Sequence, residues 1–350
     1  KRQMSGVVGA APEPRRVLVV GPAWVGDMVM AQSLFITLRR LHPGCEIDVA
    51  APAWSEPLIA RMPEIRVAVP VPLGHGEFRW GKRREIGRGL RDRRYHQAIV
   101  LPRSFKSALV PFHAGVPQRT GYRGETRLWL LNDIRPLDKT RLTQTVQRYV
   151  ALGYRSDDPQ PPPVPHPRLR VDEANQRRLC DELSLATDAP LTAMMPGAEY
   201  GPSKCWPLEY YAETARALLA RGERVWVLGS AKDRPAAERI RELAGDGVTD
   251  LSGRTQLEDA VDLLALAGRA VTNDSGLMHV AAAVGCRLVA IYGSTTPDYT
   301  PPLSDQAEIV RLSLECSPCF ERDCPLGHFR CMKDIRPEAV LERLTPPAAD

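Results

Sequence analysis

The feature that most constrains the fold is an alternation of β-branched runs with helical stretches, which occurs twice along the chain. In the first half, it predicts strands at 17–20, 47–50, 67–69 and 98–101 and helices at 28–41 and 54–62. In the second half, it predicts strands at 191–195, 225–228, 270–272 and 288–292 and helices at 208–220, 233–243, 257–267 and 277–284. Such alternation is typical of βαβ units and parallel sheets. The sequence therefore predicts an α/β fold with two parallel-sheet domains.

A proline-rich tract separates the two halves. Residues 157–167 contain six prolines, through which a helix cannot run, and such tracts act as semi-rigid spacers. We expect a disordered leader at 1–16, an N-terminal domain at 17–156, a linker at 157–167 and a C-terminal domain at 168–350. A chain of 350 residues is long enough for two domains with cores of their own. Ligands of such sheets bind outside the carboxyl ends of the strands, so we expect them in a cleft between the domains.

Charge and hydropathy limit the classes of function. The 47 Lys and Arg residues exceed the 42 Asp and Glu residues by five, which suits an anionic substrate or membrane surface but does not indicate nucleic acid. No apolar run approaches the roughly 18 residues of a membrane-spanning helix. The leader lacks the apolar core of a signal peptide. We therefore expect a cytoplasmic protein whose eight cysteines are thiols.

The loop at 21–28 lies where a nucleotide-binding fingerprint would lie, but it is not one. The dinucleotide pattern fails at its second and third glycines, and the P-loop spacing of two glycines is followed by Asp27 and Met28. A carboxylate in place of the P-loop lysine would repel a phosphate. Asp27 is therefore either a helix cap or a general base facing the cleft, and the pattern alone favours the cap.

Three junctions of the second half carry groups that suit an anionic nucleotide. The loop at 196–207 offers backbone N–H groups and Lys204, which suit a diphosphate, although an exposed lysine is the commoner case. Asp233 can hold a ribose hydroxyl pair or cap a helix. Ser275 and Gly276 place backbone N–H groups at a helix N-terminus, which is an anion site. His279, one turn later, is on spacing alone a core or capping histidine.

Basic and aromatic side chains interleave in the loops of the first half. The basic residues are Arg103, Lys106, Arg119, Arg123 and Arg127, and the aromatic ones are Phe105, Phe112, Tyr122 and Trp129. A solvated charged face is the usual explanation. The functional alternative is a funnel for an anionic, amphiphilic acceptor.

Four cysteines lie close together, at Cys316, Cys319, Cys324 and Cys331. Their density is too high for core filler, but the second pair does not have the C-x-x-C spacing of the usual zinc sites. A metal site, disulfides formed on oxidation and free thiols all fit the spacing. We favour a structural cross-link or metal site over catalysis.

Several reaction classes lack their motif. No D-x-D pair occurs, which disfavours the metal–diphosphate site of many sugar transferases. Neither an H-E-x-x-H metal helix nor a G-x-S-x-G nucleophile elbow occurs. These absences disfavour metalloprotease and serine-hydrolase chemistry.

Ten segments together resemble glycosyltransferase family 9, the ADP-heptose:lipopolysaccharide heptosyltransferases, and within that family the heptosyltransferase II group. They are 21–28, 51–54, 72–76, 104–111, 119–125, 131–133, 196–199, 229–233, 272–281 and 297–302. The resemblance spans 17–312 and 335–345, so it leaves out the cysteine segment.

The resemblance implies a GT-B fold, in which two Rossmann-like domains face each other across a cleft. It implies inverting transfer of L-glycero-D-manno-heptose from ADP-heptose to the first heptose of heptosyl-Kdo2-lipid A in lipopolysaccharide inner-core synthesis. No metal or other cofactor is implied. The acceptor lies in a membrane, so the resemblance also implies a cytoplasmic protein that associates peripherally with the inner membrane.

The resemblance also assigns roles to residues. Asp27 becomes the catalytic base, which reverses the preference from the pattern alone. Acceptor-binding residues are expected at Lys106, Arg119 and Arg123. Donor-binding residues are expected at Lys204, Gly229, Ser230, Asp233, Asp274, Ser275, Gly276 and His279.

Three alternatives remain at this stage. One is heptosyltransferase I or another sugar-nucleotide enzyme of the same architecture, such as an epimerase. A second is a nicotinamide-dependent oxidoreductase, which the broken glycine pattern disfavours. The third is a non-catalytic module that binds polyanions, in which Asp27 would have no chemical role.

Overall fold

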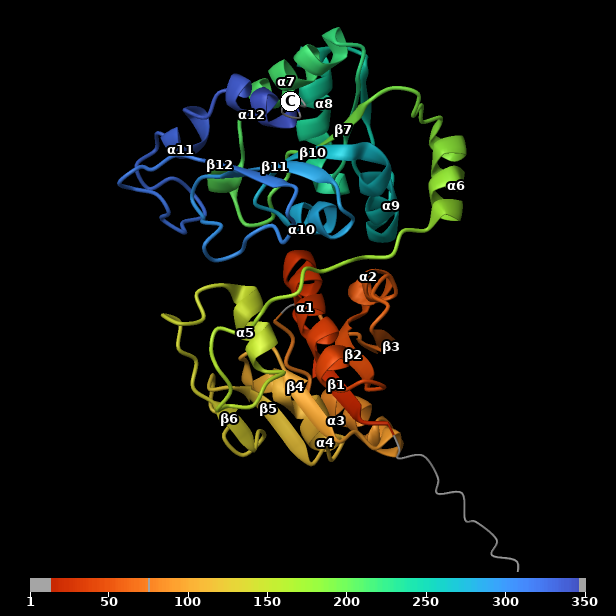
Figure 1. The fold of residues 1–350 in the computed structure, drawn as a ribbon, viewed down its shortest axis with the longest axis vertical. Helices are drawn as coiled ribbons and strands as arrows, with labels where there is room; N and C mark the ends of the chain where they lie inside the picture. Colours follow the sequence, from red (N-terminus) through yellow and green to blue (C-terminus); the bar gives the residue numbers. More distant parts are fainter. Residues whose placement is uncertain (1–13, 75, 346–350) are drawn as a thin grey trace, which may run out of the picture.

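The protein folds around two parallel sheets of six strands each (Figure 1). The structure is a computed structural model that describes residues 14–74 and 76–345. The α/β fold with two parallel sheets, expected from the alternating runs, is confirmed. Within the described ranges, no helix is long and apolar enough to cross a membrane.

The first sheet has the strand order β3-β2-β1-β4-β5-β6. Its strands are β1 (Arg16–Val20), β2 (Glu46–Pro52), β3 (Ile65–Val71), β4 (Gln97–Val100), β5 (Gln118–Tyr122) and β6 (Asp133–Arg135). Its helices are α1 (Val25–Leu41), α2 (Glu56–Ile59), α3 (Trp80–Gly89), α4 (Leu109–His113) and α5 (Thr145–Ala151). All four residues of the central strand β4 are buried, as expected for a parallel strand covered on both faces.

The second sheet has the order β9-β8-β7-β10-β11-β12. Its strands are β7 (Leu191–Met195), β8 (Arg224–Val227), β9 (Val248–Asp250), β10 (Gly268–Asn273), β11 (Arg287–Tyr292) and β12 (Ala307–Arg311). Its helices are α6 (Glu173–Leu183), α7 (Leu208–Ala220), α8 (Arg234–Ala244), α9 (Leu257–Ala267), α10 (Gly276–Ala283), α11 (Arg330–Lys333) and α12 (Pro337–Leu344). Counted from its own first strand, this sheet repeats the 3-2-1-4-5-6 order of the first. That order leaves a ligand crevice at the carboxyl ends of its first and fourth strands.

The strands missing from the sequence prediction are β5, β6, β9 and β12. No residue of β6 is buried and only Val310 of β12 is, because a strand at the edge of a sheet needs no continuous apolar run. Of the expected leader at 1–16, residues 1–13 lie outside the described residues. Its last residue, Arg16, is already the first residue of β1. The proline-rich tract at 157–167 contains neither helix nor strand and lies between α5 and α6.

The two halves meet where the N-terminus of α1 approaches α10 (Figure 1). One apolar cluster contains Met28 and Leu34 of α1 together with Met278 and Ala281 of α10. A β-carbon on Gly26 would lie 2.6 Å from Cδ2 of His279, and one on Gly276 would lie 2.9 Å from Cβ of Val25. Both glycines are therefore needed for the close contact between these helices.

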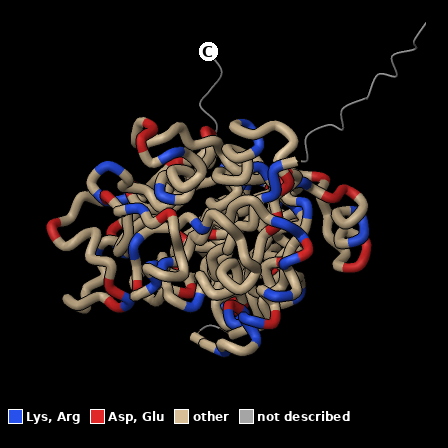
Figure 2. The backbone as a smooth tube through the Cα atoms, turned by 90° about the horizontal axis from the view of Figure 1, so that it is seen from below, with Lys and Arg blue, Asp and Glu red and all other residues tan. Residues whose placement is uncertain are grey.

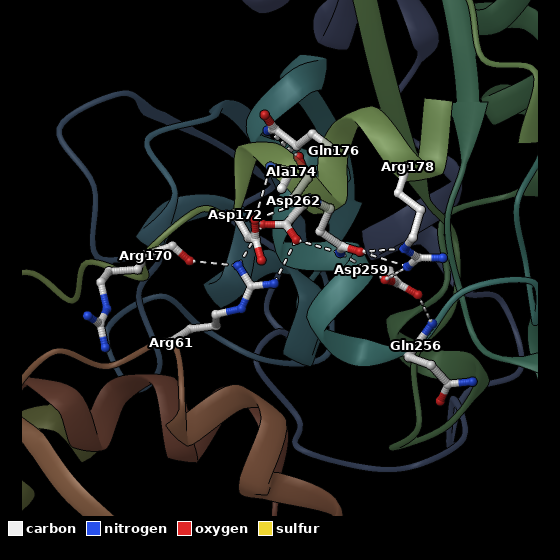
Figure 3. Close-up of polar contacts among 10 residues, drawn as sticks. Arg61, Arg170, Asp172, Ala174, Gln176, Arg178, Gln256, Asp259 and Asp262 are labelled. Atoms are coloured by element: carbon white, nitrogen blue, oxygen red, sulfur yellow. Dashed lines mark hydrogen bonds and ion pairs between the residues drawn. The ribbon is translucent and has the colours of Figure 1, made fainter. Parts of the chain in front are cut away.

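A buried ion pair also joins the two halves (Figure 3). Arg61, which follows α2, donates from Nη1 to Oδ1 and from Nη2 to Oδ2 of Asp262 on α9, at 2.7 Å each. The Asp262 side chain is fully buried. Its carboxylate also accepts the Asp172 backbone N–H at 2.8 Å and the Asn175 side-chain amide at 2.7 Å. The carboxylate thus receives four donors, two on each oxygen, from both halves of the chain.

Arg61→Ala is expected to lower the free energy of unfolding by about 3 kcal/mol, because it leaves the buried Asp262 carboxylate without a counter-charge. Urea denaturation measures the change. Arg155→Ala is the matched control, because Arg155 pairs with Asp157 on the surface and its side chain is 82% exposed. The control should hardly move the urea midpoint. An equal effect of the two substitutions would show that the buried pair does not stabilise the fold.

Candidate active site

A cavity of about 950 Å³ lies between the two sheets. The first half lines it with the turn after β1 and the start of α1: Trp24, Val25, Gly26, Asp27 and Met30. The second half lines it with segments that follow β7, β8, β10 and β11, with the first turn of α9 and with Phe320. Most of the lining thus comes from the carboxyl ends of parallel strands, where ligands of such folds bind.

Asp27 reaches the cavity from the third position of α1. The N-cap residue of this helix is Trp24, so Asp27 is not the cap that the pattern alone favoured. The pKa of Asp27 is raised to about 6, mainly by burial; the charge of Lys204 opposes this rise and that of Asp274 adds to it. At neutral pH the group is therefore an ionised carboxylate with a higher proton affinity than an ordinary aspartate.

Lys204 and Asp274 form an ion pair in the cavity. Lys204 Nζ lies 2.7 Å from Asp274 Oδ2 and 5.1 Å from the ring centroid of Tyr200. The Thr295 hydroxyl donates to the same Asp274 oxygen at 2.6 Å. The ammonium group is thereby held on one side by a carboxylate and by an aromatic face. Its position faces the cavity, where it can meet an anionic ligand.

His279 lies on α10 and contacts the first turn of α1 through Gly26. Its ring is almost fully buried. Burial lowers the pKa of His279 to about 4, against the effect of Asp274 and together with that of Lys204. The imidazole is therefore neutral at physiological pH and adds no positive charge. It combines the core position expected from spacing with a place in the cavity wall.

Ser275 and Gly276 begin α10 at the cavity wall. Ser275 is the N-cap residue, and its side chain makes no capping bond. The preceding Asn273 is fully buried, accepts the Trp206 backbone N–H at 3.1 Å and donates to the Pro196 carbonyl at 2.6 Å. Asn273 therefore ties the loop after β10 to the loop after β7. The sequence analysis assigned it no role.

Asp233 caps its own turn and also faces the cavity. Its Oδ2 accepts the backbone N–H of Ser230 at 2.7 Å and the Ser230 hydroxyl at 2.8 Å. A β-carbon on Gly197 would lie 2.3 Å from Asp233 Oδ1, and one on Gly229 would lie 2.8 Å from Asp233 Cβ. Asp233 is the N-cap residue of α8, but its side chain makes no capping bond to that helix and instead closes the preceding turn.

Further lining residues carry no role in the sequence analysis. They include Trp24, Met30, Tyr200, Gln256, Leu257, Thr295, Tyr299 and Phe320. The strand-end rule that identified Asp233 and Ser275 applies equally to Thr295, because this residue follows β11. No comparable signal exists for Phe320, which lies in the irregular segment before α11.

The expected acceptor residues do not line the cavity: Lys106, Arg119 and Arg123 all lie outside its lining. Arg119 donates from Nε to the Leu130 carbonyl and from Nη1 to the Val116 carbonyl, at 2.6 Å each. Its guanidinium therefore holds a turn of the first half together. Arg123 is exposed and Lys106 is half-buried, so these two remain accessible to a ligand outside the cavity.

The cysteine segment does not form the cross-link or metal site that we favoured. All eight cysteines are free thiols. In the described part of the chain, no group of three or more His, Cys, Asp or Glu side chains is placed to hold a metal ion. The four clustered residues Cys316, Cys319, Cys324 and Cys331 follow an irregular path, and Cys324 Sγ accepts the Phe329 backbone N–H at 3.4 Å.

The same segment braces the loop that carries Lys204. The Tyr200 hydroxyl donates to the Phe320 carbonyl, and the Ser203 backbone N–H donates to the Arg322 carbonyl at 3.2 Å. A β-carbon on Gly201 would lie 2.4 Å from that Arg322 oxygen. The segment therefore supports the cavity wall through backbone carbonyls rather than through its thiols.

Comparison with known proteins identifies the family. Residues 83–330 match the profile of glycosyltransferase family 9 (heptosyltransferase). The chain belongs to this family. Lipopolysaccharide heptosyltransferase 2 of Escherichia coli K12 is 48% identical over 338 residues, which cover 94% of this chain and 97% of that protein. Lipooligosaccharide heptosyltransferase 2 of Haemophilus influenzae is 45% identical over 340 residues, which cover 94% and 98%.

The fold of this family 9 glycosyltransferase agrees with a solved relative. The structure of E. coli ADP-heptose lps heptosyltransferase II superimposes with a TM-score of 0.83 and 45% identity, covering 94% of this chain and 97% of that one. The GT-B fold implied by the motif resemblance is thus confirmed. Family membership also argues against the oxidoreductase and the non-catalytic module.

Asp27→Asn is expected to stabilise the fold above about pH 6. The folded-state pKa is raised from 3.8 to about 6, so the folded chain holds this proton more tightly than the unfolded chain does. Protonated Asp27 therefore stabilises the fold below its unfolded-state pKa. This contribution is lost as the pH rises through its folded-state pKa. Asparagine cannot ionise, so its gain in unfolding free energy should grow with pH to at most about 3 kcal/mol.

Urea denaturation of the parent and of Asp27→Asn, at pH values from below 3.8 to above about 6, measures this gain in unfolding free energy. Asp305→Asn is the matched control, because the Asp305 side chain is 96% exposed, and its effect should not vary in this way. An Asp27→Asn effect that stays constant with pH would contradict the raised pKa.

Proposed function

We propose that this chain transfers L-glycero-D-manno-heptose from ADP-heptose to the first heptose of heptosyl-Kdo2-lipid A, with inversion at the anomeric carbon. The observation that carries the proposal is the shared cavity of Asp27, from the first half, and Lys204 with the N-terminus of α10, from the second half. Asp27 as a base would then lie across the cavity from groups that suit an anion. The names of the similar proteins, heptosyltransferase 2, support the choice of this reaction over that of heptosyltransferase I or an epimerase.

The second half would bind the ADP portion of the donor. Leu228, Leu257 and Ala260 provide an apolar wall that suits the adenine ring. Asp233, at the carboxyl end of β8, would accept hydrogen bonds from the ribose hydroxyls, as a carboxylate does at this place in related sheets. Gly229 and Ser230 form the turn that holds Asp233 in position.

The diphosphate would lie between Lys204 and the first turn of α10. The backbone N–H groups of Ser275 and Gly276, at the start of α10, have no acceptor within the helix. They lie at the positive end of the helix dipole. Lys204 adds a full positive charge, which Asp274 and Thr295 hold in position. These groups stabilise the charge that gathers on the departing ADP. The proposed reaction therefore needs no metal ion for this task.

Asp27 would act as the general base. The acceptor hydroxyl oxygen forms a bond to the anomeric carbon while the bond from that carbon to the donor phosphate oxygen breaks. The bonding electron pair leaves with ADP, and the hydroxyl proton passes to Asp27. A carboxylate whose pKa is raised to about 6 holds this proton better than an ordinary aspartate and is still ionised at neutral pH.

The acceptor would approach from the side of the first sheet. Its sugar acids and phosphates are anionic, and Lys106 and Arg123 are accessible cations outside the cavity. Arg119 supports their surroundings through its bonds to backbone carbonyls. Because the acceptor is anchored in lipid, we also propose that the enzyme works at the cytoplasmic face of the inner membrane as a peripheral protein.

Asp27→Asn is expected to lower kcat by about 10²–10⁴-fold, because the reaction loses its base. ADP release from ADP-heptose with mono-heptosylated Kdo2-lipid A, measured in EDTA, reports the rate. The kcat/KM of the parent should rise with pH to a plateau above about pH 6, since only ionised Asp27 accepts the proton. Asp305→Asn is the control and should keep the parent rate. Equal turnover by the Asp27→Asn variant would remove this residue from the chemistry.

Lys204→Met is expected to lower kcat/KM for ADP-heptose by about 10²–10³-fold, because the leaving diphosphate loses its cation. The substitution also leaves the buried Asp274 unpaired. The double variant Lys204→Met/Asp274→Asn also removes the unpaired charge of Asp274. It therefore separates the loss of the Lys204 cation from the effect of an unpaired carboxylate. If the double variant recovered the parent rate, Lys204 would serve only to neutralise Asp274.

A further inference from the structure

Four aromatic rings form a surface cluster on the first half, outside the cavity: Phe78, Trp80, Phe105 and Trp129. Their neighbouring ring centroids lie between 5.8 and 6.4 Å apart. Phe78 is 48% exposed, Trp80 37% and Trp129 52%. Single exposed apolar residues are ordinary, but a contiguous group of exposed rings marks a contact surface.

The aromatic cluster lies at the sheet edge that also carries Asp27. Phe78 follows the carboxyl end of β3, Phe105 follows that of β4 and Trp129 follows β5. Asp27 follows β1, which lies between β2 and β4 in the same parallel sheet. A partner seated on the aromatic cluster would therefore lie on the same side of the first sheet as Asp27.

The excess positive charge of the chain lies in the segment that contributes two of these rings, Phe78 and Trp80. Residues 77–94, which include α3, contain eight Arg or Lys and three Asp or Glu. This excess of five equals the formal net charge of the whole protein, so the rest of the chain is balanced. Figure 2, seen from the side of the first sheet, shows Lys and Arg positions in blue on many outer turns of the chain.

Several of these cations face solvent next to the rings. Arg84 and Arg88 are exposed, and neither is in an ion pair with any described residue. The pKa of His113 is lowered, mainly by burial. The positive charges of Arg84, Arg88 and Arg91 lower it further. The His113 ring in turn lies edge-on to Trp80 at 5.7 Å. The charges of α3 thus adjoin the aromatic cluster rather than a separate face.

The packing of α3 on α4 holds this arrangement in place. A β-carbon on Gly87 of α3 would lie 2.6 Å from the Val110 carbonyl oxygen of α4. Only glycine allows this approach, so α3 packs closely on α4. Arg83 points inward and donates to the Phe78 carbonyl at 2.7 Å, whereas Arg84 and Arg88 are exposed. The combination of exposed rings and unpaired cations is thereby built into the fold.

We propose that this aromatic–basic surface, formed by the aromatic cluster with Arg84 and Arg88, docks the enzyme on an anionic phospholipid bilayer. Aromatic rings favour the headgroup region of a bilayer, and neighbouring cations are attracted to anionic lipid phosphates. The inference deepens the proposed function and rests on it for its purpose, because a lipid-linked acceptor must be met at the membrane. The docked enzyme would present Asp27 at the sheet edge nearest the lipid.

Co-sedimentation with vesicles tests the docking surface directly. The parent is expected to bind vesicles of phosphatidylcholine mixed with phosphatidylglycerol and to bind phosphatidylcholine alone weakly. Trp80→Ala/Trp129→Ala and Arg84→Glu/Arg88→Glu should each reduce binding to the mixed vesicles by about tenfold or more. Matched controls on the second half are Ile309→Ala, an exposed apolar residue, and Arg239→Glu/Arg241→Glu on α8. Both controls should bind as the parent does.

Activity separates this inference from the proposed function. With an acceptor that lacks acyl chains, the surface variants should keep the parent rate, and with acceptor in mixed vesicles they should lose it. Vesicle binding needs no catalysis, so it remains measurable if the proposed reaction is wrong. Unchanged binding by both surface variants would overturn the docking surface. The docking surface would also be overturned if the surface variants changed only self-association, measured by light scattering, or only binding to a single-stranded DNA probe.

Discussion

The close approach of α1 and α10 sets the geometry on which the active site depends. Gly26 and Gly276 let the first turns of the two helices meet with almost no space between them, since a β-carbon on either would clash. As a result, the carboxylate of Asp27 and the positive helix end at Ser275 enter one cavity from opposite halves of the chain. Each half supplies only one of these two groups, so they share a cavity only where the halves meet.

This arrangement confines charges of both signs in a largely buried space. Asp27 and Asp274 repel each other, and Lys204 is the cation that offsets both. His279 stays neutral because burial disfavours its charged form. The site is therefore short of positive charge until α10 contributes its N-terminal dipole. Lys232 also lines the cavity, but it is paired with Glu199, another lining residue, at 3.5 Å.

The sequence predicted the central parts of this structure better than its edges. Continuous apolar runs such as that of β4 reveal buried parallel strands, whereas β6 and β12 carry too few buried residues to be recognised. Strand-end junctions located Asp27, Lys204, Asp233 and Ser275. The tertiary partners of those residues were not predictable, because Phe320 and Asn273 act through contacts between segments far apart in sequence. The bonds of Arg119 to the Leu130 and Val116 carbonyls were not predictable for the same reason.

The Arg61–Asp262 pair has a mechanical consequence for the enzyme. Its two parallel bonds resist twisting, and the carboxylate is shared with the segment that connects the two halves. If the halves open while this cluster stays intact, it becomes the fulcrum of the movement. Displacement then grows with distance from the fulcrum, so the atoms farthest from Asp262 travel most. A small rotation would thus widen the remote mouth of the cavity while the lining nearest the fulcrum keeps its spacing.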